Sequence, residues 1–296
     1  MLDLIGKVLD EKYMIEEPLG QGGMGSVYLA THIGTQRPVA VKVIAPQFMA
    51  HTEFVERFRR EAEAAGRLRH PNVVNVTDFG FTRVDSRQLA YLVMEYLDGC
   101  SLAEVLAEEG KLPLPWVADI LEQVCSAIEE AHQRGIIHRD LKPDNIWLEP
   151  NRRGGYTVKV LDFGLAKIAE AAEDPLFAPV TTTASISGIK KPLDLADEQF
   201  TEADTHVQIA ESSSISEEET NILPAPSQSS ASASLTRVGT ILGTPLYMSP
   251  EQCLGQPLGI RSDIYSLGVI TYQMLGGRTP FTGDGNSLIK KHVEES

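Results

Sequence analysis

The chain has 296 residues, of which 42% are hydrophobic and 23% are charged, so it can bury the core of one large or two small domains. Its three cysteines lie far apart without CxxC spacing, and the N-terminus lacks a signal-peptide core; this argues against a disulfide framework, a zinc site and export. The formal net charge is −15. No stretch approaches the roughly 18 apolar residues of a membrane span, so we expect a cytoplasmic chain.

Two predicted strands, 13–19 and 27–31, flank a glycine-rich turn that begins at Gly20 with the sequence GQGGMGSV. Glycines allow a close approach of the backbone to a ligand. A lone GxGxxG also occurs in dinucleotide folds, but those need a helix directly after the glycines. Here a second β-rich run follows and ends in VAVK at Lys42. Glycines with a strand-borne lysine behind them predict a nucleotide clamp.

A helix is predicted over 53–68, because its apolar residues recur along one stripe. Glu61 on this helix is the candidate ion partner of Lys42, with Glu63 as its competitor and a solvated helical charge as the alternative for both. Two further strands are predicted at 74–82 and 89–95. A glycine-containing connector follows, where backbone groups would recognise adenine.

The next elements are predicted to be helical. Ser101 begins a capping box and a short helix that ends near Gly110, and 116–134 has apolar residues at helical spacing. We assign Trp116 and Cys125 to packing on this second helix. A third helix, 262–275, is apolar nearly all round, which predicts burial on every side.

The run HRDLKPDN at His138–Asn145, followed by LDFG at 161–164, carries the chemistry. Asp140 would orient an attacking hydroxyl and accept its proton, and Lys142 can reach a migrating phosphoryl group. Asn145 and Asp162 offer hard oxygen ligands to magnesium. A single Asp-x-x-x-x-Asn would more often be a turn with Asx caps. Here all eight residues of HRDLKPDN are present and Asp-Phe-Gly follows, so a turn without catalytic function is the weaker interpretation. The spacing predicts phosphoryl transfer.

Much of the negative charge lies in one segment. Residues 170–233 hold twelve acidic residues and two lysines, a charge of −10, which leaves −5 for the rest of the chain. The segment contains SSSISEEET and SQSSASAS and has no sustained hydrophobic period. It cannot bury enough apolar surface to offset chain entropy, so a disordered insertion is predicted at about 170–235. An acidic patch for a basic partner is the alternative.

Six motifs together resemble the Hanks-type protein serine/threonine kinases of bacteria: GQGGMGSVYLA, RFRREAEAAGRLRHPNVV, YLVMEYLDG, HRDLKPDN, DFG and GTPLYMSPEQ. The resemblance covers 9–167 and 239–293 and has no counterpart for the acidic insertion. It implies an α+β bilobal protein kinase fold that is incomplete at its C-terminus. The small lobe (1–95) holds an antiparallel β-sheet and one helix, a hinge spans 96–100, and the larger lobe (101–296) is mainly helical and contains the insertion.

The resemblance implies transfer of the γ-phosphoryl group of ATP to serine and threonine hydroxyls of protein substrates, with no nucleic-acid partner. Mg²⁺ would be the metal, with Mn²⁺ as an alternative. The position of Lys142 favours Ser/Thr over Tyr as acceptor. A catalytically weak, pseudokinase-like signalling scaffold is the alternative, although such proteins usually lose residues of the type of Lys42, Asp140 or Asp162.

The resemblance also assigns individual contacts. Met94 would be the gatekeeper, Lys42 would pair with Glu61, His138 would stack with Phe163, and Asp263 would hydrogen-bond the backbone of the catalytic loop. The residues placed around the nucleotide are Leu19, Gly20, Gly22, Gly25, Val27, Ala40, Lys42, Glu61, Met94, Glu95, Leu97 and Trp147.

Two features depart from the family pattern. Trp147 stands where the family more often has Leu or Met at the floor of the adenine pocket; its indole either stacks under adenine or packs outside the pocket. Glu251 normally pairs with an arginine beyond the next helices, and the chain ends at Ser296 before reaching it. We therefore expect the front part of a longer protein, whose continuation could tether it to a membrane.

Regulation is expected within the activation segment, which by resemblance runs from Asp162 to Glu251. Thr236 or Thr240 would be autophosphorylated and contacted by Arg139, ordering the segment. Phosphorylation in the acidic serine runs is the alternative. Thr244 would help to orient Asp140 and Lys142 at the substrate platform. Autophosphorylation in trans would need a homodimer.

Overall fold

The computed structural model describes residues 3–152, 154–163 and 245–295. Contacts divide the chain into two units, Met1–Pro179 with Thr240–Ser296 and Val180–Gly239, and all described residues belong to the first. The predicted insertion at about 170–235 lies outside the described residues. Within them, none of the helices combines the length and hydrophobicity that a bilayer-crossing segment needs.

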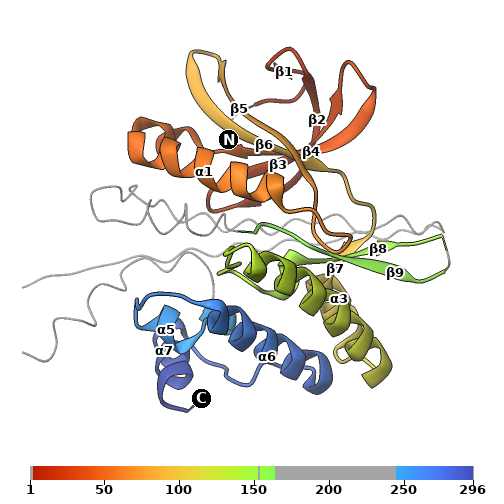
Figure 1. The fold of residues 1–296 in the computed structure, drawn as a ribbon, viewed down its shortest axis with the longest axis vertical. Helices are drawn as coiled ribbons and strands as arrows, with labels where there is room; N and C mark the ends of the chain where they lie inside the picture. The colour runs from red at the N-terminus through yellow and green to blue at the C-terminus, as the bar shows by residue number, and fades with distance from the viewer. Residues whose placement is uncertain (1–2, 153, 164–244, 296) are drawn as a thin grey trace, which may run out of the picture. The chain divides into compact units, whose positions relative to one another are not determined.

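The first part of the chain forms an antiparallel sheet in the order β1-β2-β3-β4-β6-β5 (Figure 1). Its strands are β1 (Val8–Leu9), β2 (Tyr13–Gly22), β3 (Gly25–His32), β4 (Arg37–Ile44), β5 (Val76–Val84) and β6 (Arg87–Glu95). β6 lies between β4 and β5 and is buried along most of its length, in keeping with its run of apolar residues.

One helix packs against this sheet. A short 3₁₀ turn, η1 (Pro46–Ala50), leads into α1 (Thr52–Arg67), whose stripe of Phe54, Phe58, Ala62 and Ala65 is buried. Phe58 meets the β5 rings Phe79 and Phe81 edge-on, with ring centroids 6.3 and 5.7 Å apart. The helical period of the sequence thus gives α1 a single apolar face that joins the core of the sheet.

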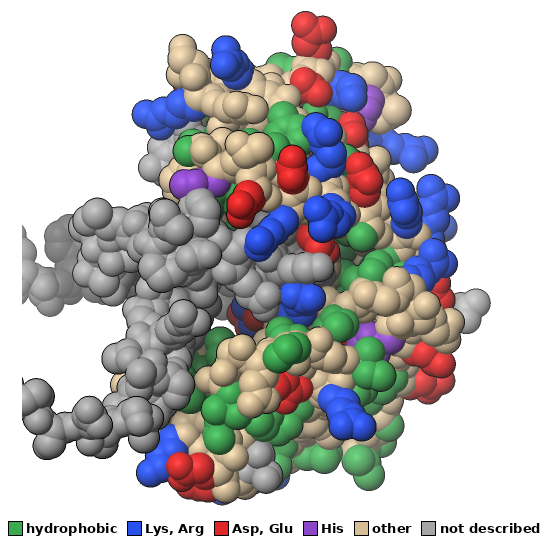
Figure 2. Space-filling view, turned by 60° about the vertical axis from the view of Figure 1, so that its left-hand side comes forward, with side chains coloured by type: hydrophobic (Ala, Val, Ile, Leu, Met, Phe, Trp, Pro, Cys, Tyr) green, Lys and Arg blue, Asp and Glu red, His purple; other side chains and the backbone are tan. Residues whose placement is uncertain are grey.

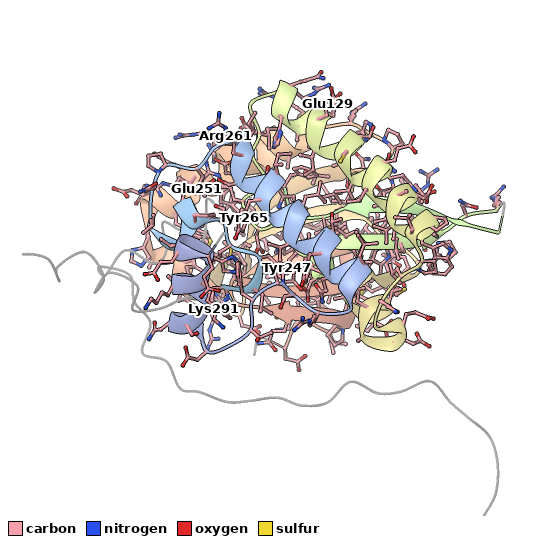
Figure 3. The ribbon with its side chains drawn as sticks, turned by 90° about the horizontal axis from the view of Figure 1, so that it is seen from below. Glu129, Tyr247, Glu251, Arg261, Tyr265 and Lys291 are labelled. Atoms are coloured by element: carbon pink, nitrogen blue, oxygen red, sulfur yellow. The ribbon has the colours of Figure 1, made fainter. Side chains whose placement is uncertain are left out.

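The second part of the described chain is mainly helical. Its elements are β7 (Cys100–Ser101), α2 (Leu102–Glu109), α3 (Leu114–Gln133), η2 (Pro143–Asn145), β8 (Ile146–Pro150), β9 (Tyr156–Val160), η5 (Pro245–Tyr247), α5 (Pro250–Cys253), α6 (Ile260–Gly276) and α7 (Gly285–Glu294). Strands β7, β8 and β9 form a small antiparallel sheet, and α3 lies beside α6 in Figures 1 and 3. The predicted capping box at Ser101 is present, and α2 ends at Gly110.

The segment after α1 is attached to β9. Val74 N–H donates to the Val160 carbonyl at 3.0 Å, and Val160 N–H donates to the Asn72 carbonyl at 2.8 Å. The Asn72 side chain adds a bond from Nδ2 to the Val158 carbonyl at 2.9 Å. These bonds join the sheet-forming part of the chain to the strand that leads directly into Asp162.

Two packing predictions are wrong. Helix α6 is not buried on every side, since Ile260, Ile264, Tyr272 and Leu275 are 54, 56, 47 and 45% exposed. The opposite face, with Leu267, Ile270 and Met274, lies in the core, because only that face meets α3 and its neighbours. Figure 2 shows hydrophobic side chains grouped on the lower part of the view. On α3, Cys125 is exposed and Trp116 is 48% exposed, although its ring meets Tyr156 edge-on.

Helix α7 carries a buried histidine. His292 is fully buried, and its Nδ1 lies 2.8 Å from the Tyr265 hydroxyl. Its Nε2 has no hydrogen-bond partner, the one such atom among the buried side chains of the described residues. Burial lowers the pKa of the imidazole, and the neighbouring backbone of Leu246 and Pro245 opposes this only in part. The ring is therefore held neutral.

Because His292 is buried and neutral, we expect the free energy of unfolding to depend on pH. Because the pKa of His292 is lowered in the folded chain, the unfolded chain binds more protons at this residue as pH falls through about 6.5, so the free energy of unfolding should fall. His292→Gln should remove this part of the slope. Urea unfolding of both proteins between about pH 7.5 and 5.5 measures it, and equal slopes would contradict the account.

Candidate active site

The site begins with the loop between α3 and η2, which is held by one buried carboxylate. Asp263 on α6 is 1% exposed. Its Oδ2 accepts a bond from His138 N–H at 2.9 Å and lies 2.7 Å from His132 Nε2, while its Oδ1 accepts from Arg139 N–H at 2.9 Å. The expected bonds from the loop backbone to Asp263 are confirmed.

A second cluster surrounds Asp140, whose side chain is 50% exposed. Its Oδ2 accepts a bond from Lys142 Nζ at 2.8 Å and a longer one from Asn145 Nδ2 at 3.3 Å. Asn145 Nδ2 also donates to the Asp140 carbonyl at 2.7 Å. The carboxylate is thus fixed through one oxygen beside a positive charge, in a position that solvent and an incoming group can reach.

The third component follows β9. Asp162 has a left-handed backbone, with φ of 60°, and its Oδ2 lies 2.7 Å from Lys42 Nζ on β4. Burial alone would raise the pKa of this carboxyl, but the charge and hydrogen bond of Lys42, with smaller contributions from His138 and Lys142, outweigh burial and lower it. Asp162 is therefore held ionised.

His138 and Leu161 connect the two clusters. His138 Nε2 lies 2.8 Å from the Leu161 carbonyl, and Leu161 N–H donates to the Asn145 carbonyl at 2.9 Å. The rings of His138 and Phe163 meet with centroids 4.8 Å apart at 60°, an edge contact instead of the expected stack. The side chains at 42, 140, 145 and 162 therefore belong to one connected site.

The donor set of this site fits a divalent cation. Asp162 contributes an ionised carboxylate. Asn145 uses its Nδ2 for Asp140, so the Oδ1 of the same amide is the atom that a cation would use. Hard oxygen ligands of this kind suit Mg²⁺ or Mn²⁺, and a bound cation would compete with Lys42 for the Asp162 carboxylate.

Apolar residues predicted around a nucleotide also meet. Val27, Ala40, Met94 and Leu97 belong to one hydrophobic cluster together with Leu161, which precedes Asp162. Leu19 is 44% exposed on β2. A small pocket behind Met94 is lined by Ala65, Leu68, Val73, Val74, Val76, Leu92, Met94, Asp162 and Phe163.

The glycine-rich turn lies between β2 and β3. Gly25 has φ of +157°, and a Cβ there would lie 1.9 Å from the Val43 carbonyl oxygen, so only glycine fits. At Gly20 and Gly22 a Cβ would meet no atom within 4 Å. Packing therefore requires glycine at position 25, whereas the other two leave the backbone exposed.

Trp147 lies on β8 and is tied to the connector that follows β6. Its Nε1–H donates to the Asp98 carbonyl at 2.7 Å. The neighbouring Gly99 has φ of +101°, and a Cβ there would lie 2.2 Å from the Leu148 carbonyl oxygen. The indole is thus fixed against the connector predicted to bind adenine, which brings it to the edge of the predicted pocket.

One predicted partner differs in the structure. Lys42 pairs with Asp162, whereas the sequence predicted Glu61 on α1. The Lys42 ammonium donates a hydrogen bond to Asp162 Oδ2 at 2.7 Å, and this contact takes the place of the predicted one. Glu95 makes its ion pair with Lys159 at 2.8 Å and accepts a bond from Asn75 N–H. Thr236, Thr240 and Thr244 lie outside the described residues, and Arg139 lies within them.

Glu251 has a partner within the chain. The Ser262 hydroxyl donates to its Oε1 at 2.6 Å. Burial alone would raise the pKa of the Glu251 carboxyl, but hydrogen bonds from Ser262, the backbone and Ser249, together with the charge of Arg261, lower it. Figure 3 labels Glu251 on α5 and Arg261 near the start of α6.

Two contacts of the site escaped the sequence analysis. Gln252 Nε2 donates to the Arg139 carbonyl at 2.6 Å. The spacing Ser249-x-x-Gln252 is a capping-box signature and could have located the helix start, but not this bond. The second contact is the hydrogen bond from Trp147 Nε1–H to the Asp98 carbonyl. Its acceptor is a backbone group, and no sequence pattern identifies such an acceptor.

Comparisons with known proteins agree with this geometry. Residues 13–186 and 227–296 match the family described as protein kinase domain. The chain is 35% identical over 294 residues to serine/threonine-protein kinase pkn3 of Myxococcus xanthus, covering 99% of this chain and 43% of that protein. It is 33% identical over 293 residues to serine/threonine-protein kinase PknA of Mycobacterium tuberculosis, covering 98% and 53%.

A solved structure is similar as well. The crystal structure of the Mycobacterium tuberculosis PknI kinase domain aligns with a TM-score of 0.59 and 25% identity, covering 95% of this chain and 80% of that one. The chain therefore spans about half the length of the curated relatives that it matches, and most of the solved kinase domain.

Proposed function

We propose that this chain, which belongs to the protein kinase domain family, transfers the γ-phosphoryl group of ATP to serine and threonine hydroxyls of other proteins. One observation carries the proposal: the Lys42–Asp162 pair and the Asp140–Lys142–Asn145 cluster are joined through His138 and Leu161 into a single site. Such a site can hold a charged phosphate chain and present a base to a hydroxyl.

Asp140 is proposed as the group that orients the acceptor hydroxyl. Because its Oδ2 is engaged by Lys142 and Asn145, its Oδ1 is the oxygen that would take the proton. Lys142, at the same carboxylate, is placed to offset the charge that develops on the transferred group. Base and cation are thus held by one another before substrate arrives.

Asp162 and Asn145 are proposed as the ligands of a divalent metal, with Mg²⁺ as the first choice and Mn²⁺ as the alternative. The metal would supply charge neutralisation on the phosphate oxygens. In that state Lys42 would leave Asp162 for the α- and β-phosphates, and Glu61 remains the proposed partner of its ammonium.

The nucleotide base is proposed to lie between β2–β3 and the connector. Val27, Ala40, Met94 and Leu97 supply apolar contacts, and Leu19, Gly20, Gly22, Gly25 and Glu95 complete the proposed pocket. The Trp147 indole, held by the Asp98 carbonyl, is proposed to form its floor. An ATP complex in which adenine lies away from this ring would contradict the assignment.

Regulation is proposed to act through Arg139. Phosphorylation of Thr236 or Thr240 would give its guanidinium a phosphate partner, and Thr244 would contribute to the substrate platform. Mass spectrometry of the chain after incubation with ATP tests this, since phosphate confined to residues 181–233 would contradict it. Autophosphorylation in trans, within a transient homodimer in the cytoplasm, is the proposed route.

The acceptor class has a direct test. After incubation with labelled ATP and a basic protein substrate that offers all three hydroxyl residues, the label should appear on phosphoserine and phosphothreonine. The expectation rests on Lys142, which contacts the Asp140 carboxylate and stands at a position where the resemblance implies a lysine in serine/threonine kinases. Acid hydrolysis and phosphoamino-acid separation measure the outcome, and label on phosphotyrosine alone would contradict the proposed class.

A further inference from the structure

The residue before Asp140 has an unusual backbone. Arg139 is not glycine, yet its φ is +71°, in the left-handed region that L residues rarely adopt. Such a conformation persists only where the surrounding structure holds it in place. Its position matters because the carbonyl of Arg139 belongs to the peptide group that leads into Asp140.

Two different helices hold the backbone of Arg139. Its N–H donates to Asp263 Oδ1 on α6 at 2.9 Å. Its carbonyl accepts a bond from Gln252 Nε2 on α5 at 2.6 Å. On the other side of the same peptide group, Asp140 N–H donates to His138 Nδ1 at 3.3 Å. The plane that precedes Asp140 is therefore fixed at its oxygen by Gln252 and at its nitrogen by His138.

The side chain of Gln252 is itself locked. Its Oε1 accepts a bond from Ser249 N–H at 2.9 Å, and the backbone N–H of Gln252 donates to Ser249 Oγ at 3.3 Å. Ser249 is fully buried. Since Oε1 is engaged by the cap, the amide can only turn its Nε2 toward Arg139.

The cap alone does not require glutamine. In a capping box a glutamate at this position accepts the same bond from the serine N–H. Only an amide can also donate to a carbonyl. The second function of the side chain, the bond to Arg139, therefore explains why an amide stands here.

We propose that Gln252 is a positioning residue for phosphoryl transfer, which orients the Asp140 carboxylate by holding the Arg139 carbonyl. The inference rests on the proposed function. The bond from Gln252 to the Arg139 carbonyl joins α5, which follows the turn η5, to the loop that presents Asp140. A displacement of α5 would therefore displace the base.

Gln252→Glu separates the two functions of the side chain. The glutamate keeps the cap with Ser249 N–H but sets a carboxylate oxygen against the Arg139 carbonyl oxygen. We expect kcat to fall about tenfold or more, with KM for ATP changed less than about twofold. The deficit relative to the unmodified chain should shrink as pH falls towards about 5, because a protonated carboxyl can donate to the carbonyl again.

Ser249→Ala is the matched control. It removes the capping hydroxyl and keeps the amide that donates to Arg139, so kcat should stay within about threefold although thermal stability falls. If Gln252→Glu does not fold, Gln252→Met, which has neither donor nor charge, replaces it. Equal losses of kcat in the glutamine and serine variants, or a glutamate variant as active as the unmodified chain, would overturn the proposal.

Hydrogen exchange of the segment 138–142 provides a readout that does not depend on activity. The glutamine variant should exchange faster there than the unmodified chain, and Ser249→Ala should not. Unchanged exchange in the glutamine variant would overturn the proposal even if no phosphoryl transfer were detected. Absent transfer by the unmodified chain, with exchange as expected, would instead count against the proposed function.

Discussion

Asp140→Asn is expected to lower kcat for phosphoryl transfer by about 10²–10⁴-fold, the usual contribution of a positioned general base. The amide has the shape of the carboxylate, and it can still accept a bond from Lys142, which now reaches Asp140 Oδ2 at 2.8 Å. It cannot take a proton from the acceptor hydroxyl. Rates under saturating ATP and substrate, with thermal unfolding as a check on folding, measure the effect.

Asp144→Asn is the control for this change. Asp144 lies in the same loop and is exposed, and it has no place in the proposed chemistry. Its substitution should change kcat by less than about threefold. A comparable loss in both variants would mean that loop charge, and not a base at Asp140, governs the rate.

Asp263→Asn should cause the largest loss of stability, about 3 kcal/mol in the free energy of unfolding. Asp263 accepts bonds from His138 and Arg139 N–H and lies 2.7 Å from His132 Nε2, while only 1% exposed. An amide can keep one acceptor, but its NH₂ must then face a buried donor. Urea unfolding, followed by circular dichroism, measures the difference.

Asp284→Asn provides the comparison. Asp284 is exposed and caps α7 by accepting a bond from Ser287 N–H at 2.8 Å, a role that asparagine fills equally well. Its substitution should shift the free energy of unfolding by less than about 0.5 kcal/mol. A loss at Asp263 no larger than this would contradict the role assigned to the buried carboxylate.

Local patterns explain what the sequence could predict. The β-rich run that ends at Lys42, the stripe of α1 and the capping box at Ser101 each depend on neighbours within a few positions, and each element is present. The spacing from Asp140 to Asn145 is likewise local, and the two residues are joined by hydrogen bonds from Asn145 Nδ2 to the Asp140 carbonyl and carboxylate. These elements and loop contacts were predictable for this reason, whereas the fold class was predicted from the resemblance of the motifs to protein kinases.

Contacts between distant residues were harder to predict. Lys42 has Glu61 and Asp162 as competing partners, and the choice depends on what the site binds; here the ammonium meets Asp162. The composition of α6 indicated burial all round, yet burial depends on which elements pack against each face. Trp147 and Gln252 donate to backbone carbonyls, which every residue offers, so no sequence pattern identifies these bonds.

A crystal structure with Mg²⁺ and a non-hydrolysable ATP analogue tests the central claim most directly. The account predicts a cation at about 2.1 Å from the Asp162 carboxylate and from Asn145 Oδ1, with Lys42 moved onto the phosphates and the γ-phosphate facing Asp140. A nucleotide bound elsewhere, or a cation without these ligands while Lys42 stays on Asp162, would contradict it.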